Sequence, residues 1–298
     1  MKKKFLMLTL LFFLVLSNTI LASISLSLEE MRGYTNYIIQ GEDNWGDEWK
    51  SKLDFPLNVA LIGFNYENTS PILNKIYFTY KTNIDKSAGT FTDSDWMFGL
   101  EDRLIYAETK TRMQNAIILD GGFKGYKKTL TDTIDYTCNL GYQHQFYHLF
   151  AHDGWQINKT VSPPIITEIV GDALEYKIHY YIPYVGFNFF NNNPKKTFWK
   201  ITYNFSPFIW AKDWDDHLLR VDHKISESLT MGTFHAIGGS VEHQLFDQLN
   251  IIANINYSLI STKGTQRQTF TSDIVYENIK SQINSNQISF NLELAYNF

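Results

Sequence analysis

The sequence has little cysteine and few long apolar stretches. Its single cysteine, Cys138, excludes an internal disulfide and a zinc site built from cysteines. The one extended apolar run, Phe5–Leu16, is short for a transmembrane helix, which needs about 20 residues. No other stretch is long and apolar enough to be such a helix. If the chain spans a membrane, we therefore expect it to do so as a closed β-barrel.

Positive charge is scarce as well. The formal net charge is −5, and removal of an export signal that carries three lysines would lower it to about −8. An acidic exported protein is a poor partner for nucleic acid and attracts cationic partners. Aromatic residues, by contrast, make up 16% of the chain, which suits aromatic girdles at two membrane interfaces.

The amino terminus has the order of a secretory signal peptide. Lys2, Lys3 and Lys4 precede the apolar run, and Ser17–Ala22 suits cleavage. The alternative, an uncleaved membrane anchor, is disfavoured by the shortness of the run. We predict that residues 1–22 are a signal peptide and that residues 23–298 form one domain.

The carboxyl-terminal residues alternate strictly between apolar and polar side chains. A strand places alternate residues on opposite faces, so one face here is apolar and the other is polar. The apolar set is Ile288, Phe290, Leu292, Leu294, Tyr296 and Phe298. In an exported chain that ends on an aromatic residue, this pattern predicts a strand between lipid and a wet barrel lumen, in the bacterial outer membrane.

The same alternation recurs along the chain, and polar stretches separate the alternating segments. Such segments are Leu53–Leu61, Ile72–Asn83, Trp199–Ser206 and Ala253–Leu259. The longer polar stretches, predicted to be outward loops, are Gly41–Glu48, Lys86–Asp102, Ala151–Asp172, Lys212–Ser226 and Ser261–Asn278. We predict an all-β fold, a monomeric antiparallel barrel of about ten strands with its apolar band in outer-membrane lipid.

Two acid-rich segments are predicted to lie in long loops at the outer ends of strands. They are Asp93-Ser94-Asp95-Trp96-Met97 and Asp213-Trp214-Asp215-Asp216-His217. Each could be a solvated loop. Together they suggest a histidine held by a carboxylate as general base on water, with a second carboxylate pair that shares a proton. Such a site would hydrolyse amides without a covalent nucleophile or a metal.

These segments resemble the motifs of the omptin family of outer-membrane proteases. Weaker similarities, in family order, are Ser51–Phe55, Gly141–Gln143, Tyr176–Lys177 and Pro183–Gly186. The resemblance implies a ten-stranded barrel that cleaves polypeptides beside basic residues. It further implies that His217 and Asp93 flank the attacking water, that Asp215 orients His217 and that Asp95 assists Asp93. Asp213 matches one acidic wall of the family's pocket for a basic side chain.

The chain also departs from the family. Phe98–Tyr106 replaces a tryptophan-threonine-aspartate and histidine-proline signature. The second acidic wall has no match, because Glu29 and Glu30 lie nearby but do not align. Phe146 and His179 fall near the positions of the basic residues that grip lipopolysaccharide. No cofactor is expected; a dependence on lipopolysaccharide is left open, without identified binding residues.

Strand periodicity conflicts with this site. Extending the alternation of Trp199–Phe205 places Asp213, Asp215 and His217 on the lipid-facing side. A cleft that contains all three therefore requires a loop or bulge between Trp210 and Asp213.

Other functions fit parts of the sequence. His144, His148 and His152 share one strand face, but successive members lie about 13 Å apart, too far for a single metal ion. A small porin or adhesin-like barrel with a degenerate protease site is the main alternative. A lipid-hydrolysing barrel ranks last, because no serine lies in a recognisable nucleophile context.

Overall fold

The computed structural model describes residues 22–42, 45–70, 74–97, 102–192 and 197–298, and it is all-β. The strands are β1 (Ala22–Glu42), β2 (Glu48–Pro56), β3 (Val59–Ser70), β4 (Asn74–Asn83), β5 (Ser87–Trp96), β6 (Ile105–Lys124), β7 (Lys128–Thr129), β8 (Ile134–Asn158), β9 (Ile165–Asn191), β10 (Thr197–His217), β11 (Lys224–Phe246), β12 (Leu249–Phe270) and β13 (Val275–Asn297). In these ranges no helix is long and apolar enough to cross a membrane. The predicted signal peptide, apart from Ala22, lies outside the described residues.

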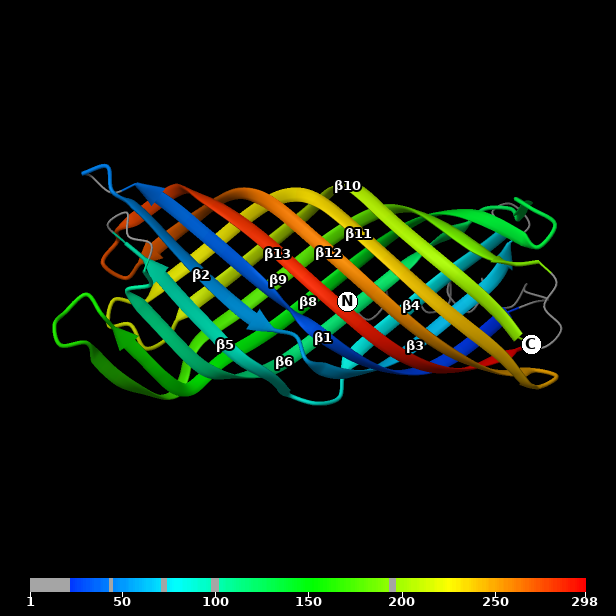
Figure 1. Ribbon diagram of the computed structural model, residues 1–298, viewed down its shortest axis with the longest axis horizontal. Helices are drawn as coiled ribbons and strands as arrows, with labels where there is room; N and C mark the ends of the chain where they lie inside the picture. Colours follow the sequence, from blue (N-terminus) through cyan, green and yellow to red (C-terminus); the bar gives the residue numbers. More distant parts are fainter. Residues whose placement is uncertain (1–21, 43–44, 71–73, 98–101, 193–196) are drawn as a thin grey trace, which may run out of the picture.

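Ten strands form a closed antiparallel ring (Figure 1), which confirms the predicted barrel. The ring runs β1-β3-β4-β6-β8-β9-β10-β11-β12-β13 and closes where β13 pairs with β1. Between β1 and β6, the wall of the barrel is formed by β3 and β4 in the half that contains the carboxyl terminus. In the opposite half it is formed by β2 and β5. The described strands number thirteen because two long strands are interrupted and the short β7 flanks a turn.

The predicted strand Leu53–Leu61 is one of those interrupted. The peptide N–H of Leu57 donates to the carbonyl of Gly33 at 2.9 Å, and the N–H of Gly33 donates to Asn58 Oδ1 at 3.1 Å. Gly33 has a φ of +147°, and a Cβ there would lie 2.0 Å from the carbonyl oxygen of Asn286. Only glycine allows this close approach of three strands where the wall changes from β3 to β2.

An apolar band surrounds the half of the barrel that contains the carboxyl terminus. On β13, Phe290, Leu292 and Leu294 are exposed, whereas Ser289 and Asn291 are buried in the interior. Outward apolar residues at the same level on neighbouring strands include Leu26 and Leu28 on β1 and Ile255, Tyr257 and Leu259 on β12. This is the lipid-facing pattern predicted from the final strand.

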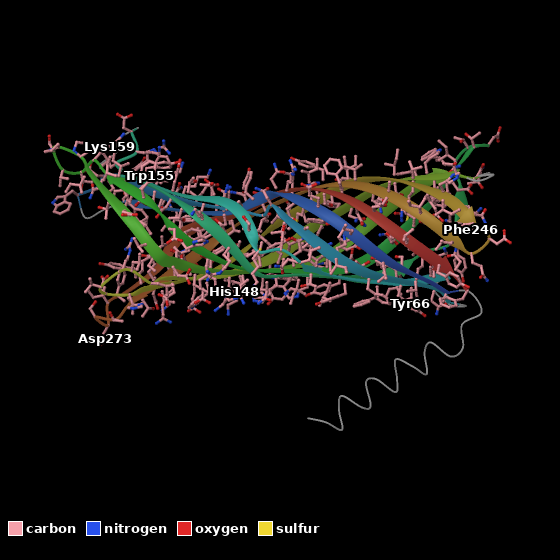
Figure 2. The ribbon with its side chains drawn as sticks, turned by 90° about the horizontal axis from the view of Figure 1, so that it is seen from below. Tyr66, His148, Trp155, Lys159, Phe246 and Asp273 are labelled. Atoms are coloured by element: carbon pink, nitrogen blue, oxygen red, sulfur yellow. The ribbon has the colours of Figure 1, made fainter. Side chains whose placement is uncertain are left out.

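Beyond the apolar band the barrel continues as strands, where the sequence was predicted to form loops. Most of Ala151–Asp172, Lys212–Ser226 and Ser261–Asn278 belongs to β8–β13. Many outward residues there are polar or charged, as at Lys212, Glu227, Lys263 and Arg267, and a few apolar ones such as Ile166 and Val170 are exposed near the rim. Figure 2 shows this end with Trp155, Lys159 and Asp273, and the opposite end with Tyr66 and Phe246. The outer part of the barrel therefore stands clear of lipid.

The interior is not uniformly wet. A buried apolar cluster fills its middle and outer parts and draws side chains from β1, β2, β3, β5, β6 and β8–β13. Phe55 stacks on Tyr176 with ring centroids 4.0 Å apart, and Phe91 lies 4.7 Å from Phe55. The prediction of a wet lumen is correct only for the other half, where polar residues such as Ser25, Glu29 and Asn291 are buried.

The position of the lipid band predicts the cost of a charge on the outer surface. Leu292→Lys should destabilise the barrel by about 2–4 kcal/mol, because it places an ammonium in lipid. Gln282→Lys, on the outward face of the same strand beyond the band, should cost less than about 1 kcal/mol. Urea unfolding in lipid vesicles measures both; equal costs for the two variants would contradict the placement of the band.

Candidate active site

A register change in β10 turns the acidic segment towards the interior. Pro207 and Phe208 both face outward, and the pairing of β10 with β11 shifts between Ser206 and Ile209. From Ile209 onward the odd-numbered residues point inward. The predicted bulge therefore exists, but it lies before Trp210 rather than after it. The proline and the two consecutive outward residues reverse the face on which each later side chain lies.

Both acidic segments lie in strands, and the prediction that they form loops was wrong. Asp213, Asp215 and His217 are inward residues of β10, with exposed fractions of 2%, 1% and 8%. Asp93 and Asp95 belong to β5, opposite Leu53 and Ser51 of β2. Rigid strands therefore hold all five side chains, beyond the lipid band and above the aromatic cluster of Phe55, Phe91 and Tyr176.

Asp215 is held by an aromatic neighbour. The Tyr37 hydroxyl donates a hydrogen bond to Asp215 Oδ2. His217 Nε2 lies 3.8 Å from the same oxygen, which is too long for a hydrogen bond. The predicted aspartate–histidine pair is thus adjacent in the structure, with the nearer carboxylate oxygen already occupied by a tyrosine from β1.

Three buried polar atoms of the cluster lack a protein partner. Among the described residues, Asp93 Oδ1, Asp215 Oδ1 and His217 Nε2 make no hydrogen bond. Buried polar atoms usually have a hydrogen-bond partner, so each of these three atoms is a place where a ligand or a water molecule can bind. Asp95 pairs with Ser51 of β2, whose side chain lowers the pKa of Asp95. The arrangement leaves acceptors and a ring nitrogen available to a water molecule or a peptide.

The electrostatics bring Asp93 and Asp215 into one site. Burial raises the pKa of Asp93 well above the usual range of a carboxyl group, and the charges of Asp95 and Asp215 raise it further. Burial also raises the pKa of Asp95 and of Asp215. This part of the barrel lies outside lipid. The surroundings that raise these pKa values are therefore the protein interior, with the aromatic core beneath the acids.

His217 experiences the opposite effect. Burial lowers the pKa of its imidazole well below the ordinary value, and the charges of Lys224 and Arg220 lower it further. A histidine of this kind is neutral at physiological pH and can accept a proton.

Two cations of this site are absent from the sequence-based prediction. Lys224 opens β11 directly opposite His217, with an exposed fraction of 7%, and Arg220 lies in the connecting loop. Their charges act on Asp93, Asp95 and Asp215. In the sequence, the inward placement of Lys224 is indicated only by the alternation of β11. That alternation can be interpreted only when the first residue of the strand is known.

Asp213 lies deeper than the other acids and has its own partners. It accepts hydrogen bonds from the Ser228 peptide N–H at 2.9 Å and from the Tyr176 hydroxyl at 3.2 Å. Burial, followed by the charge of Asp215, raises the pKa of Asp213 to about 7.

Neither glutamate considered for the second acidic wall lies beside Asp213. Glu29 pairs with Lys81 in the lipid-band half of the barrel, and Glu30 pairs with Arg32 on the outer surface. At the site, β1 contributes Tyr37, whose hydroxyl interacts with Asp213 as well as with Asp215. The groups that take the place of a second glutamate near Asp213 are therefore aromatic, Tyr37 and Tyr176.

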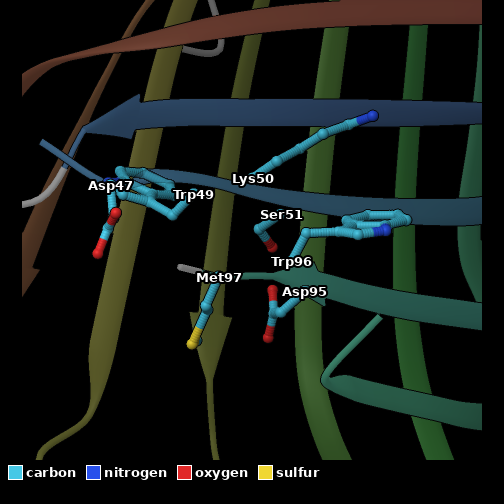
Figure 3. A pocket seen from close by; sticks show the side chains of 7 residues that line it. All are labelled: Asp47, Trp49, Lys50, Ser51, Asp95, Trp96 and Met97. Carbon is cyan, nitrogen blue, oxygen red and sulfur yellow. The ribbon is translucent and has the colours of Figure 1, made fainter. Parts of the chain in front are cut away.

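A pocket opens beside Asp95 at the outer rim (Figure 3). Its volume is about 190 Å³, and its lining is Asp47, Trp49, Lys50, Ser51, Asp95, Trp96 and Met97. The ammonium of Lys50 lies 4.8 Å from the centre of the Trp96 ring. Apolar side chains next to the half-buried acid Asp95 offer a place for part of a substrate. Within the described ranges, no group of three or more His, Cys, Asp or Glu side chains is arranged to hold a metal ion.

Phe146 and His179, which the sequence analysis placed near the family's lipopolysaccharide-binding positions, lie on the outward surface of β8 and β9. Phe146 stacks on His179 at 4.4 Å, and His144 Nε2 lies 3.1 Å from His179 Nδ1. His148 pairs with Glu175 at 2.7 Å. These histidines engage neighbouring side chains and face away from the acidic site.

The fold and the position of the acidic cluster define an outer-membrane barrel with a buried polar site beyond the lipid. The omptin family model matches residues 19–298, and the chain belongs to the omptin family of outer-membrane proteases. Its location is the bacterial outer membrane. A comparison with curated proteins finds no match.

A solved structure of an outer-membrane protease shares the fold. The outer-membrane protease OmpT from Escherichia coli superposes with a TM-score of 0.81 at 17% identity, over 94% of this chain and 98% of that chain. The translocator domain of the autotransporter NalP from Neisseria meningitidis gives a TM-score of 0.37 at 9% identity, over 93% of this chain and 88% of the other. At this identity, the likeness to OmpT concerns the fold.

The raised pKa of Asp93 predicts a pH-dependent stability. A carboxyl group whose pKa is higher folded than unfolded stabilises the fold at low pH, and this stability is lost as pH rises through the folded pKa. Asparagine cannot ionise and avoids that loss. Asp93→Asn should therefore be more stable than the wild type at pH 8, by about 1–3 kcal/mol, with a smaller advantage at pH 5.

Urea unfolding at pH 5 and pH 8 measures this difference. Asp132→Asn, in an exposed loop at the other end of the barrel, is the control and should show little change at either pH. A greater advantage of Asp93→Asn at pH 5 than at pH 8 would contradict the burial of the acid pair.

Proposed function

We propose that this chain is an endopeptidase that hydrolyses polypeptides with water activated between His217 and Asp93. The observation that carries the proposal is the cluster of Asp93, Asp215 and His217, in which each side chain keeps one buried polar atom without a protein partner. The cluster lies beyond the lipid band, where a peptide outside the cell can reach it.

The proposed reaction assigns a role to each group. Neutral His217 takes a proton from a water molecule as the water oxygen attacks the peptide carbonyl carbon. Ionised Asp215 then stabilises the imidazolium that forms. Asp93 and Asp95 have raised pKa values, so the pair can share a proton. As the carbon–nitrogen bond breaks, the leaving amine takes up a proton from the site. No covalent intermediate, metal or cofactor takes part.

We further propose a preference for arginine or lysine next to the cleaved bond. Asp213 lies two residues before Asp215 on the same face of β10, and a buried cation needs a carboxylate partner. The chain is acidic, which steers cationic polypeptides towards it. Because the groups in place of a second glutamate are aromatic, Asp213 would provide the specificity by charge, and Tyr37 would stack against the substrate side chain.

The apolar cluster inside the barrel argues against a porin. Buried side chains from strands all around the ring meet in the middle and outer parts of the interior. Such packing leaves the proposed solute path filled. The non-enzymatic alternative that survives is an adhesin-like barrel, which would fold without cleaving peptides. We propose that the protein acts as a monomer. Whether lipopolysaccharide activates it is tested by measuring cleavage with and without this lipid.

Loss of the proposed general base should abolish most turnover. His217→Ala is expected to lower kcat by about 10²–10⁴-fold, the range contributed by a positioned base. His148→Ala, on the outward face of β8, should leave kcat within about twofold. The measurement is peptide cleavage by the refolded barrel, with and without lipopolysaccharide. Equal turnover by His217→Ala and the wild type would reject this mechanism.

Asp213→Asn tests the proposed specificity. The variant keeps a hydrogen-bonding side chain beside Ser228 but lacks the charge, so discrimination for arginine and lysine should fall by about tenfold or more. Asp216→Asn, whose side chain faces outward on the same strand, is the control. Mass spectrometry of a cleaved peptide library gives the preference. Wild-type cleavage that ignores basic residues would refute the role of Asp213.

A further inference from the structure

Lys224 is a buried lysine inside the proposed site. Its backbone pairs with His217 of β10 on one side and with Phe270 of β12 on the other. In the alternation of β11 it shares the inward face with Ser226 and Ser228. A buried ammonium is costly unless negative charge surrounds it. Burial lowers the pKa of Lys224, and the acids of β5 and β10 supply the negative charge that acts against this effect.

Ionisable groups surround Lys224 and His217 from several elements. Asp93 and Asp95 from β5, Asp215 from β10 and Arg220 from the loop before β11 act on Lys224. Around Asp215 lie three further groups: Asp213 from β10, Tyr37 from β1 and Tyr176 from β9. Four of these are carboxyl groups. The two cations differ in burial, because Arg220 is exposed whereas Lys224 is buried. Lys224 is thus the internal counter-charge of the cluster.

The proposed hydrolysis requires a particular arrangement of protons before water attacks. His217 must be neutral to accept a proton, and Asp215 must be ionised to stabilise the imidazolium that forms. A cluster of carboxylates alone favours the opposite arrangement, because negative charge draws a proton onto the histidine and adjacent acids retain theirs. A fixed positive charge beside both groups reverses that preference.

We propose that Lys224 is a positioning residue of this site, with a buried ammonium that keeps His217 neutral and Asp215 ionised before the water is activated. This inference rests on the proposed peptidase function for its catalytic consequence. The placement of Lys224 opposite His217, and its burial among the acids, carry it.

The electrostatics of the two neighbours support this role. Among the neighbouring charges, that of Lys224 lowers the pKa of His217 the most. It also lowers the pKa of Asp215. Removing the ammonium should raise both pKa values. The pH range in which His217 is neutral and Asp215 is ionised would then begin at a higher pH.

The first experiment follows the protonation of His217 directly. In the folded barrel with ¹³C-labelled histidine, the His217 signal is assigned by its loss in His217→Ala. Lys224→Met should raise the apparent pKa of His217 by about one unit or more. Lys224→Arg, which keeps the charge, should restore the wild-type value. Lys200→Met, which removes an inward-facing lysine in the other half of the barrel, should have no effect.

The second experiment measures the dependence of kcat/KM on pH. In Lys224→Met the acidic limb should move to higher pH by the same amount as the His217 titration, whereas in Lys224→Arg it should stay in place. A purely structural role for Lys224 would lower activity at every pH and leave the limb where it is. Lys224→Gln gives the same test if the methionine variant does not refold.

The two experiments separate the two proposals. An unchanged His217 titration in folded Lys224→Met would overturn the role of Lys224, whatever the activity. A shifted titration in a barrel that cleaves no peptide at any pH would retain that role and remove the peptidase function.

Discussion

The burial of carboxyl groups on an apolar floor is the constraint on which the rest of the site depends. Phe55, Phe91 and Tyr176 pack against one another inside the barrel, and the acids lie above them. Without that floor the acids would be solvated and would have ordinary pKa values. With it, ionisation of the acids is costly, and tyrosine hydroxyls and the ammonium of Lys224 offset part of the cost.

The barrel is built to place this cluster outside the membrane. One half carries the lipid-facing band and a polar interior. In the other half many outer residues are polar, and the interior holds part of the apolar cluster with the acidic site above it. The change from β3 and β4 to β2 and β5, at Gly33 and Asn58, lies between the two halves and lets β5 present Asp93 and Asp95 to β10.

Some of this architecture could be predicted from the sequence, for physical reasons. The final strand alternates perfectly, because lipid and the interior impose opposite requirements on its faces, and this indicates a barrel in the outer membrane. The conflict between the alternation of Trp199–Phe205 and the inward placement of Asp215 also predicted a bulge. Its position was missed because Pro207 and Phe208 both suit a lipid-facing surface, so no polar residue marks the change.

Other features leave no readable signal in the sequence. Where both faces of a strand are polar, as in the outer part of β12, periodicity vanishes and the segment is mistaken for a loop. Alternation also cannot say which face is inward, so Leu53 and Phe55 gave no sign that they belong to an interior core. Lys224 meets His217 only through strand pairing across a loop.

In the proposed reaction, water activated by the aspartates and histidine attacks the peptide bond. Cleavage of a peptide library in H₂¹⁸O containing hydroxylamine, followed by mass spectrometry, tests this step most directly. If water attacks directly, every new carboxyl terminus carries one ¹⁸O atom and no hydroxamate forms. Hydroxamate products would reveal a covalent acyl intermediate and exclude direct attack by water.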